Sequence, residues 1–203
     1  MDETLIRGDM VELQCIQDFQ KRGYYCSIPF SGSCRYDVVV DINDVLYKIQ
    51  CKSSTYHEEG VLHMDATRST TNTKKTTRYA YSKNEVDYFY TCYNNYSFLI
   101  PIEEISTSKY LRLKKPKTGI QSTMSIGNDY LLDNVLDAIL NNNGKIKHYQ
   151  DHCIISIENQ KEWSSDELMK KYSQRQINYI RESISKKKLA YGYHWMFKEF
   201  PEL

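Results

Sequence analysis

Three polar residues, Asp37, Gln50 and Lys52, are spaced so that a β-hairpin would gather them on one face of a sheet. Strands are expected over 36–42 and 45–52, because both segments are rich in β-branched and aromatic residues and an Asn-Asp pair between them is typical of a two-residue turn. That turn sets Asp37 opposite Gln50, and the two-residue period of a strand places Lys52 on the same face. Together the three groups could bind a cation and stabilise a developing negative charge. They could also be the solvated face of a half-exposed hairpin.

A predicted helix over 5–22 supplies a fourth polar group to the same region. Its apolar residues follow one another at spacings of three and four, the period of a helix face that packs on a core. Glu12 lies on this face, so its carboxylate is directed to the place where the helix meets the sheet. A buried carboxylate is costly unless a metal, a cation or hydrogen bonds compensate it. The apolar face consists of Val11, Cys15, Ile16 and Phe19.

The four polar positions lie within a longer series of short motifs. These motifs are Gly8-Asp9-Met10-Val11-Glu12, Arg22-Gly23-Tyr24, Ile28-Pro29-Phe30, Arg35 to Asp41, Ile49-Gln50-Cys51-Lys52-Ser53, Glu85 to Phe89 and Phe98 to Pro101. Over the first two-thirds of the chain, the series resembles the PD-(D/E)xK endonucleases associated with group I introns. The sequence departs from the family name at Tyr36, which stands where Pro would precede the Asp.

The resemblance implies an active site formed by Glu12, Asp37, Gln50 and Lys52, with Gln in place of the usual acid before x-Lys. It also implies a site for Mg2+, or for Mn2+ as a substitute, whose ligands are Asp37, Glu12, Gln50 and the backbone carbonyl of Cys51. The Gln amide contributes an oxygen but no charge, so metal binding is expected to depend on the two carboxylates and the substrate phosphate. Lys52 would hold the nucleophile or stabilise the developing charge.

The chain is expected to fold as an α/β protein with an appended unit. Residues 1–126 are predicted to form a PD-(D/E)xK restriction-endonuclease-like core with a mixed β-sheet, and residues 127–144 a connecting helix and linker. Residues 145–203 are predicted to form a small α-rich extension that binds DNA. Two short helices around a tight turn near 172–174 indicate a helix-turn-helix there, although a helical hairpin for packing or dimerisation has the same pattern.

Positive charge is concentrated beyond the proposed site. Residues 1–65 contain 11 acidic and 6 basic side chains, whereas residues 66–203 contain 15 acidic and 21 basic ones. Clustered Lys and Arg are typical of phosphate contacts, although each cluster could be an ordinary solvated loop. Residues 66–83 are mostly polar without an apolar period, so a long segment that is flexible or ordered by DNA is expected. The predicted DNA-binding residues are Arg35, Arg68, Asn72, Lys74, Lys75, Arg78, Lys114, Lys115, Arg175, Asn178, Arg181, Lys186 and Lys187.

Composition limits the compartment in which the protein works. The 203 residues contain no apolar run long enough to span a membrane, and the first twenty lack the pattern of a secretion signal. The cytoplasm of a bacterium or of a phage-infected cell is therefore expected. The six cysteines form no CxxC pair, which favours reduced thiols over a zinc site.

The predicted activity is metal-dependent, site-specific cleavage of double-stranded DNA of the homing type. One active site per chain and two phosphates to cut favour a homodimer or a homotetramer. A junction-resolving, repair or restriction nuclease with the same core is a second interpretation. A third is a non-catalytic DNA- or protein-binding regulator or inhibitor, in which the neutral Gln50 marks a decayed nuclease site.

Overall fold

Helix α1 (Glu3–Lys21) opens the fold and agrees with the predicted helix over 5–22. Its acidic first turn and its basic last turn both suit the helix dipole. The chain then reverses at Gly23, whose φ of +86° is a conformation that favours glycine. The computed structural model describes residues 3–71, 73, 75–115, 125–141, 143–146, 148, 154–198 and 203.

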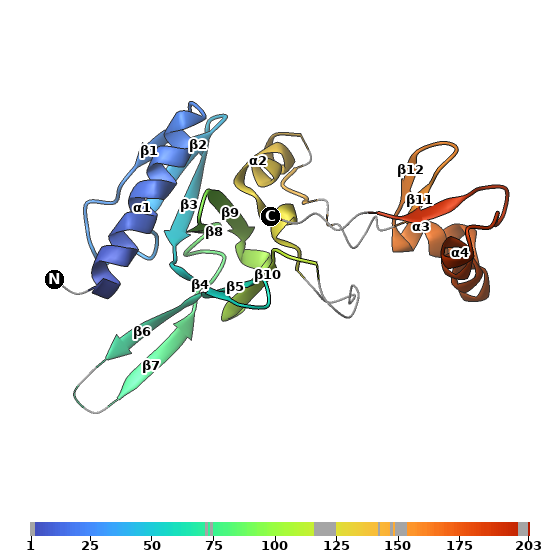
Figure 1. Cartoon of the computed structure of the whole chain (residues 1–203). Coiled ribbons are helices and arrows are strands. Elements are labelled where there is room, and N and C mark those ends of the chain that lie inside the picture. Colours follow the sequence, from blue (N-terminus) through green and yellow to red (C-terminus); the bar gives the residue numbers. More distant parts are fainter. Residues whose placement is uncertain are drawn as a thin grey trace.

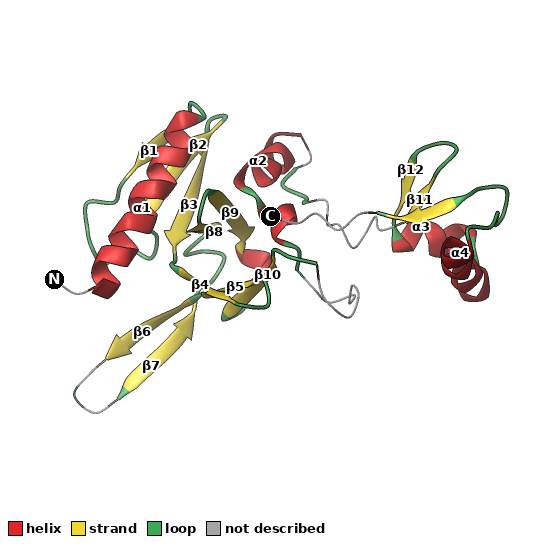
Figure 2. Ribbon diagram, in the orientation of Figure 1, coloured by secondary structure: helices red, strands yellow, loops and turns green. Residues whose placement is uncertain are grey.

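A five-stranded sheet in the order β1-β2-β3-β8-β9 lies beside α1 (Figures 1 and 2). It is mixed, because β3 and β8 run parallel whereas the other neighbouring strands are antiparallel. The predicted α/β fold with a mixed sheet is therefore confirmed. The strands are β1 (Tyr25–Ser27), β2 (Val38–Ile42), β3 (Val45–Cys51), β8 (Tyr88–Tyr93) and β9 (Tyr96–Pro101).

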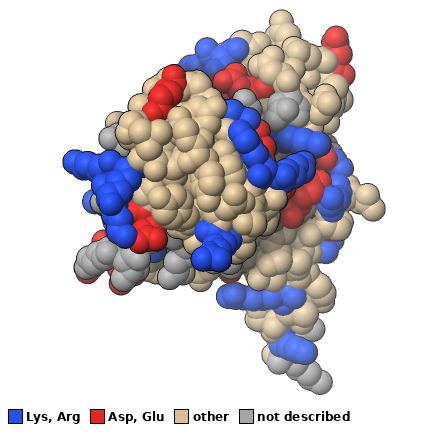
Figure 3. Space-filling model, turned by 90° about the vertical axis from the view of Figure 1, so that its right-hand side faces the viewer, with Lys and Arg blue, Asp and Glu red and all other residues tan. Residues whose placement is uncertain are grey.

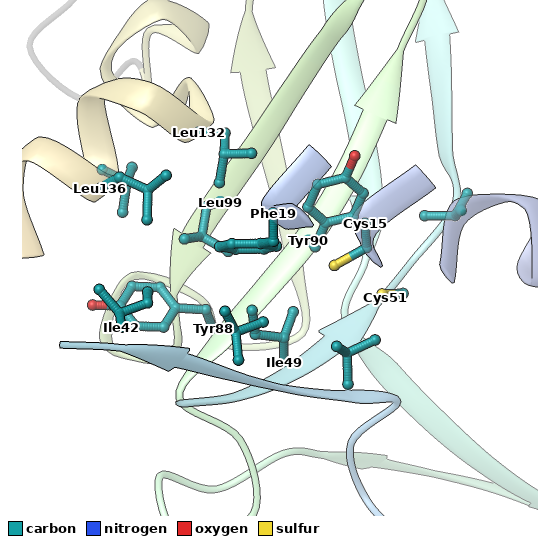
Figure 4. Packing of buried hydrophobic residues seen from close by; sticks show 14 residues of the cluster. Cys15, Phe19, Ile42, Ile49, Cys51, Tyr88, Tyr90, Leu99, Leu132 and Leu136 are labelled. Carbon is teal, nitrogen blue, oxygen red and sulfur yellow. The ribbon is translucent and has the colours of Figure 1, made fainter. Parts of the chain in front are cut away.

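This sheet separates two hydrophobic clusters, since successive strand residues point to opposite faces. On one face, Tyr90 belongs to a cluster with Phe19 of α1 and Leu132 of α2 (Leu132–Asn141), whose packing Figure 4 shows. On the other face, Phe89 packs in a cluster with a second sheet. Each fully buried aromatic or aliphatic side chain stabilises the fold by about 2 kcal/mol. The central sheet is therefore packed against hydrophobic side chains on both of its faces.

The second sheet has three strands in the order β10-β5-β4. Its strands β4 and β5 were not predicted. A turn at Gly60 joins β4 and β5 with a φ of +76°, and a Cβ there would lie 2.6 Å from the Cβ of Lys114. Short strands of mixed polarity carry little periodic signal, which explains why they are hard to predict. The bounds are β4 (Ser54–His57), β5 (Val61–Asp65) and β10 (Ser108–Arg112), and the 3-10 turn η1 (Ile102–Glu104) precedes β10.

A long segment that is flexible or ordered by DNA is expected over residues 66–83, and no strand is predicted there. These residues contain a two-stranded antiparallel ribbon, β6 (Thr67–Thr71) and β7 (Thr76–Ala80), that projects from the core in Figure 1. Thr is β-branched and favours strands, and both faces of the ribbon are largely open to solvent. A strand with two solvated faces shows no alternation of apolar and polar residues, so the pattern was absent although the strands are present.

The C-terminal unit combines helices and strands. The two predicted helices are confirmed as α3 (Ser165–Lys171) and α4 (Gln174–Lys186). Each begins with a capping box, in which Ser164 and Glu167 cap α3 and Ser173 and Gln176 cap α4. The unit is less α-rich than predicted, because it also contains a three-stranded antiparallel sheet in the order β12-β11-β13. The strands are β11 (Ile154–Ser156), β12 (Lys161–Trp163) and β13 (Trp195–Phe197).

This unit has a hydrophobic cluster of its own. Trp163 and Trp195 lie 5.8 Å apart between ring centroids, and Ile180 of α4 packs with them as a fully buried residue. The indole of Trp195 donates to the carbonyl of Ala190 at 2.8 Å, so its polar N–H is satisfied. The two tryptophans are therefore structural residues of a small core.

Two segments near the C-terminal unit are attached to the N-terminal core. After the short turn η2 (Gly127–Tyr130) and α2, the side chain of Ile146 packs against both core clusters. His148 forms ion pairs with Glu104 and Asp129, at 3.2 and 3.6 Å. At the other end, the backbone N–H of Leu203 donates to Leu113 at 2.9 Å and its side chain joins the second cluster.

No helix in the described part of the chain is long and apolar enough to cross a membrane. The described cysteines Cys15, Cys26, Cys34, Cys51 and Cys92 are free thiols. Cys153 lies outside the described residues.

Candidate active site

The β2–β3 hairpin has the predicted register. Both residues of its turn, Asn43 and Asp44, have positive φ values of 53° and 64°, as a type I′ turn requires. Val38 pairs with Ile49, and the N–H of Asp37 donates to the carbonyl of Ile49 at 2.9 Å, so Asp37 stands opposite Gln50. The structure therefore brings these two polar residues together at the end of the sheet.

One oxygen of the Asp37 carboxylate is held by several donors. The backbone N–H of Cys51 donates to Oδ2 at 2.7 Å, and the side-chain amide of Gln50 donates to the same oxygen. The Gln50 amide nitrogen also donates to the carbonyl of Cys51 at 3.3 Å. Two of the four predicted metal ligands thus face the partial positive charge of an amide. The Gln50 amide thus places partial positive charge between the Asp37 and Cys51 oxygens, where a bound cation would place a full charge.

Glu12 approaches the site from the other face of the sheet, on helix α1. Burial raises the pKa of Glu12, and the negative charges of Asp37 and Asp9 raise it further. Burial also raises the pKa of Asp37, whereas the Cys51 N–H, the Lys52 ammonium and the Gln50 amide oppose that shift. Two carboxylates whose charged forms are both disfavoured indicate a site that a bound cation would stabilise.

Lys52 directly follows β3, and both its backbone N–H and its ammonium group are held by hydrogen bonds. Its backbone N–H donates to the carbonyl of Tyr90 at 2.9 Å. Its Nζ donates to the carbonyl of Thr67 at 3.0 Å and lies 5.2 Å from the centre of the Tyr81 ring. Burial lowers the pKa of Lys52, and the negative charges of Asp37 and Asp65 oppose this shift.

The donor set suits a hard divalent cation. The described residues contain no cluster of three or more His, Cys, Asp or Glu side chains that could hold a metal ion. The groups at the site are instead two carboxylates, from Glu12 and Asp37, and the backbone carbonyl of Cys51. The Gln50 side chain turns its amide nitrogen to two of these oxygens, so its own oxygen would face a cation only after the amide rotates. Oxygen ligands of this kind fit Mg2+, which usually keeps several waters and binds through one or two carboxylates plus substrate phosphates.

Three predicted DNA-binding arginines are engaged in ion pairs at the base of the ribbon. Arg35 and Arg68 both face Glu85, at 3.6 and 3.3 Å. Arg78 lies 3.2 Å from Asp65. Arg35 and Arg78 are at least half exposed, whereas only 24% of the Arg68 side chain is exposed. Arg68 is therefore placed to hold the ribbon rather than to contact DNA.

The predicted lysines of the N-terminal unit differ in exposure. Lys75, Lys114 and Lys115 are exposed, whereas Asn72 and Lys74 lie outside the described residues. The basic stretch that begins at Lys109 is not uniformly exposed. Lys109 itself is buried and donates to the hydroxyl of Tyr130 at 2.8 Å, so it is a structural residue.

The predicted contact residues of α4 are exposed. Arg175, Asn178 and Arg181 recur every three residues, which places them on neighbouring turns of one side of the helix. Lys186 pairs with Glu182 one turn earlier, and Lys187 ends the helix in the left-handed region with a φ of 50°. Figure 3 views the molecule from the right-hand side of Figure 1 and shows Lys and Arg side chains at several places on that face and on the projecting ribbon.

The structure also contains a buried carboxylate that was not predicted. Asp18 accepts hydrogen bonds from the hydroxyls of Tyr90, at 2.6 Å, and Ser97, and from the amide of Gln14 at 2.9 Å. Its position on the buried face of α1, three residues after Cys15, is the sequence signal that could have revealed it. Because protein donors surround it, Asp18 is a structural anchor between the helix and the sheet.

Comparisons with known proteins agree with this geometry. The PD-(D/E)XK endonuclease family matches residues 2–133. Among solved structures, the fold is similar to that of a bacterial homing endonuclease, I-Ssp6803I, with a TM-score of 0.57 and 20% identity over 71% of this chain and 100% of that one. No curated protein matches the sequence. Since the family match covers most of the chain and includes every residue of the site, the protein belongs to the PD-(D/E)XK endonuclease family.

Proposed function

We propose that the protein is a divalent-metal-dependent endonuclease that cuts both strands of duplex DNA at a specific site. The observation that carries this proposal is the convergence of Glu12, Asp37, Gln50 and Lys52 at one end of the central sheet. The homing-type role is proposed by analogy with the bacterial homing endonuclease whose fold is similar.

In this proposal, different residues of the site bind the metal and stabilise the developing negative charge. Asp37, Glu12, the Gln50 amide oxygen and the Cys51 carbonyl would hold Mg2+, or Mn2+ in its place. The metal, when bound, polarises the scissile phosphate and lowers the pKa of water. Lys52 neutralises the negative charge that develops on the phosphate, and its partly buried position strengthens that interaction.

The ribbon β6–β7 is proposed to read the DNA. A two-stranded β-ribbon fits the major groove, where hydroxyl groups can bond to base edges. The register places Ser69 beside Arg78 on one face and Thr70 beside Thr77 on the other. Hydroxyls thus line both faces, and the exposed Arg78 and Lys75 add positive charge for phosphates. The exposed face of α4 supplies a second contact with Arg175, Asn178 and Arg181.

Cleavage of a pool of random-sequence duplexes with Mg2+ tests the proposal directly. Asp37→Ala removes a proposed metal ligand, and Asp41→Ala is its matched control at the other end of the same strand. We expect discrete double-strand cuts by the wild type and the control and none by Asp37→Ala. A protein that retains duplexes but never cuts them would instead favour the non-catalytic interpretation, to which the neutral Gln50 gives some support. Cuts confined to branched DNA would favour a junction-resolving enzyme.

A homo-oligomer is proposed because a single site must serve two strands. The outer face of α1 suits such an assembly, since Ile6, Met10 and Leu13 form an apolar stripe that is 41%, 61% and 61% exposed. Antiparallel contact between two copies of α1 would bring the acidic start of each helix to the basic end of the other. We expect Met10→Glu to dissociate the assembly in sedimentation analysis. Leu46→Glu, at an exposed apolar residue of the β2–β3 hairpin, is the control and should not.

A further inference from the structure

The ammonium group of Lys52 is held by the two residues at which the ribbon leaves and rejoins the core. Thr67 is the first residue of β6, and its carbonyl accepts from Lys52 Nζ at 3.0 Å. Tyr81 directly follows Ala80, the last residue of β7, and its ring lies 5.2 Å from the same nitrogen. Because Thr67 and Ala80 pair across the ribbon, both contacts lie at its base.

Both holding residues are themselves fixed to the core. The N–H and the hydroxyl of Thr67 donate to one oxygen of Asp65, at 2.8 and 2.6 Å. The Tyr81 ring meets the fully buried Phe89 edge to face, with 5.4 Å between centroids and 84° between planes. The core therefore holds both groups in place against the lysine.

We propose that Tyr81 is a positioning residue for Lys52, and that the base of the ribbon holds the ammonium group of Lys52 in the orientation that the reaction needs. This inference rests on the proposed nuclease function and assigns a role to a residue outside the four that form the site. The ribbon then has two roles. It contacts the DNA, and its base orients the lysine.

A lysine side chain needs more than one contact to be held in a single orientation. A Lys side chain has a flexible four-carbon stem and three donors, so a single hydrogen bond leaves much of its motion free. The face of an aromatic ring attracts an ammonium group and restricts it without using a donor. In the described part of the chain, Thr67 takes one N–H of Lys52, which leaves the others for a phosphate oxygen or a nucleophile.

The first test compares Tyr81→Leu with Tyr81→Phe in single-turnover cleavage at saturating DNA. Phe keeps the ring face, whereas Leu keeps an apolar side chain but loses the attraction to the ammonium. We expect Tyr81→Leu to cleave about tenfold more slowly and Tyr81→Phe to stay within about twofold of the wild type. Kd for the same duplex, measured without metal, should be unchanged in both. Equal rates for the two variants, or a loss confined to Kd, would overturn the inference.

A second measurement does not depend on cleavage. NMR relaxation of the Lys52 Cε–Hε groups in the folded, DNA-free protein reports how strongly the side chain is held. Tyr81→Leu should give a lower order parameter for these groups than Tyr81→Phe, because only the ring face restricts the ammonium group. Equal order parameters in the two variants would refute the contact, whereas a wild type that binds duplexes but never cuts them would refute the proposed function instead.

Discussion

Substitution of Gln50 by Glu restores the acid that the family usually has before x-Lys, and its effect can be worked out from the contacts of Gln50. The side chain is only 8% exposed and its amide donates to Asp37 and to the Cys51 carbonyl. A hydrogen bond to a charged partner contributes about 1.5–3 kcal/mol. A carboxylate in its place would face Asp37 as a like charge, which costs about 4 kcal/mol at 4 Å with an effective dielectric constant of about 20.

We therefore expect the metal-free Gln50→Glu protein to lose several kcal/mol of its free energy of unfolding at pH 8. The loss should shrink below pH 5, because the new carboxyl then takes up a proton and can donate again. With a third anionic ligand, the affinity for Mg2+ or Ca2+ in the absence of DNA should rise by about 100-fold, since the charge of the ligands sets divalent affinity.

Chemical denaturation with and without the metal measures the first effect, and isothermal titration calorimetry measures the second. Gln50→Met is the matched control, because it removes the hydrogen bonds without adding a charge. It should be destabilised less than Gln50→Glu and should gain no metal affinity. A Gln50→Glu protein that is as stable as the wild type without metal, and binds metal no better, would refute the role assigned to the amide.

Three further predictions follow from other contacts. Glu12→Gln should abolish cleavage yet raise the free energy of unfolding of the metal-free protein at pH 7 by less than about 1 kcal/mol, given solvent screening. Burial and Asp37 raise the pKa of Glu12, so this gain should vanish below pH 4.5, where the carboxyl is protonated in both states. Hydrogen bonds to Asp129 and Glu104 raise the pKa of His148 to about 10, so thermal melts of His148→Ala should show a deficit that is full below pH 6.5 and fades as the pH rises towards 10. Arg181→Ala should lower the slope of log Kd against log salt by about 1 in duplex binding, whereas Lys161→Ala, whose ammonium pairs with Glu167 at 3.3 Å, should leave that slope unchanged.

The core of the site could be predicted because its signals are local. An Asn-Asp turn between two β-rich segments determines the register of Asp37 and Gln50, and alternation along the strand then places Lys52. Glu12 could be predicted for a similar reason, since a charged residue on an apolar helix face stands out. The serine caps of α3 and α4 are equally local signals.

Other parts depend on contacts between residues far apart in the sequence. The network of Lys109, Glu104, Tyr130 and His148 joins segments that are up to 44 residues apart, and no spacing rule connects them. The strands β11, β12 and β13 have three residues each, too few for a periodic pattern. The strands of the ribbon could not be predicted from the pattern, because neither of its faces is buried. The role proposed for Tyr81 could not be predicted either, since one of eighteen tyrosines carries no signal by itself.

The attachment of both His148 and Leu203 to the N-terminal core limits how far the C-terminal unit can travel. Ile154 follows His148 by six positions, and Leu203 follows Lys198 by five. At about 3.5 Å per residue, these connections can span at most about 21 and 18 Å. A unit connected to the core at two points can neither swing freely nor rotate fully about one of the connections. The lengths of the two connections would then set the distance along a duplex between the position that the C-terminal unit contacts and the position of the cut. Lengthening one connection alone should change that distance less than lengthening both.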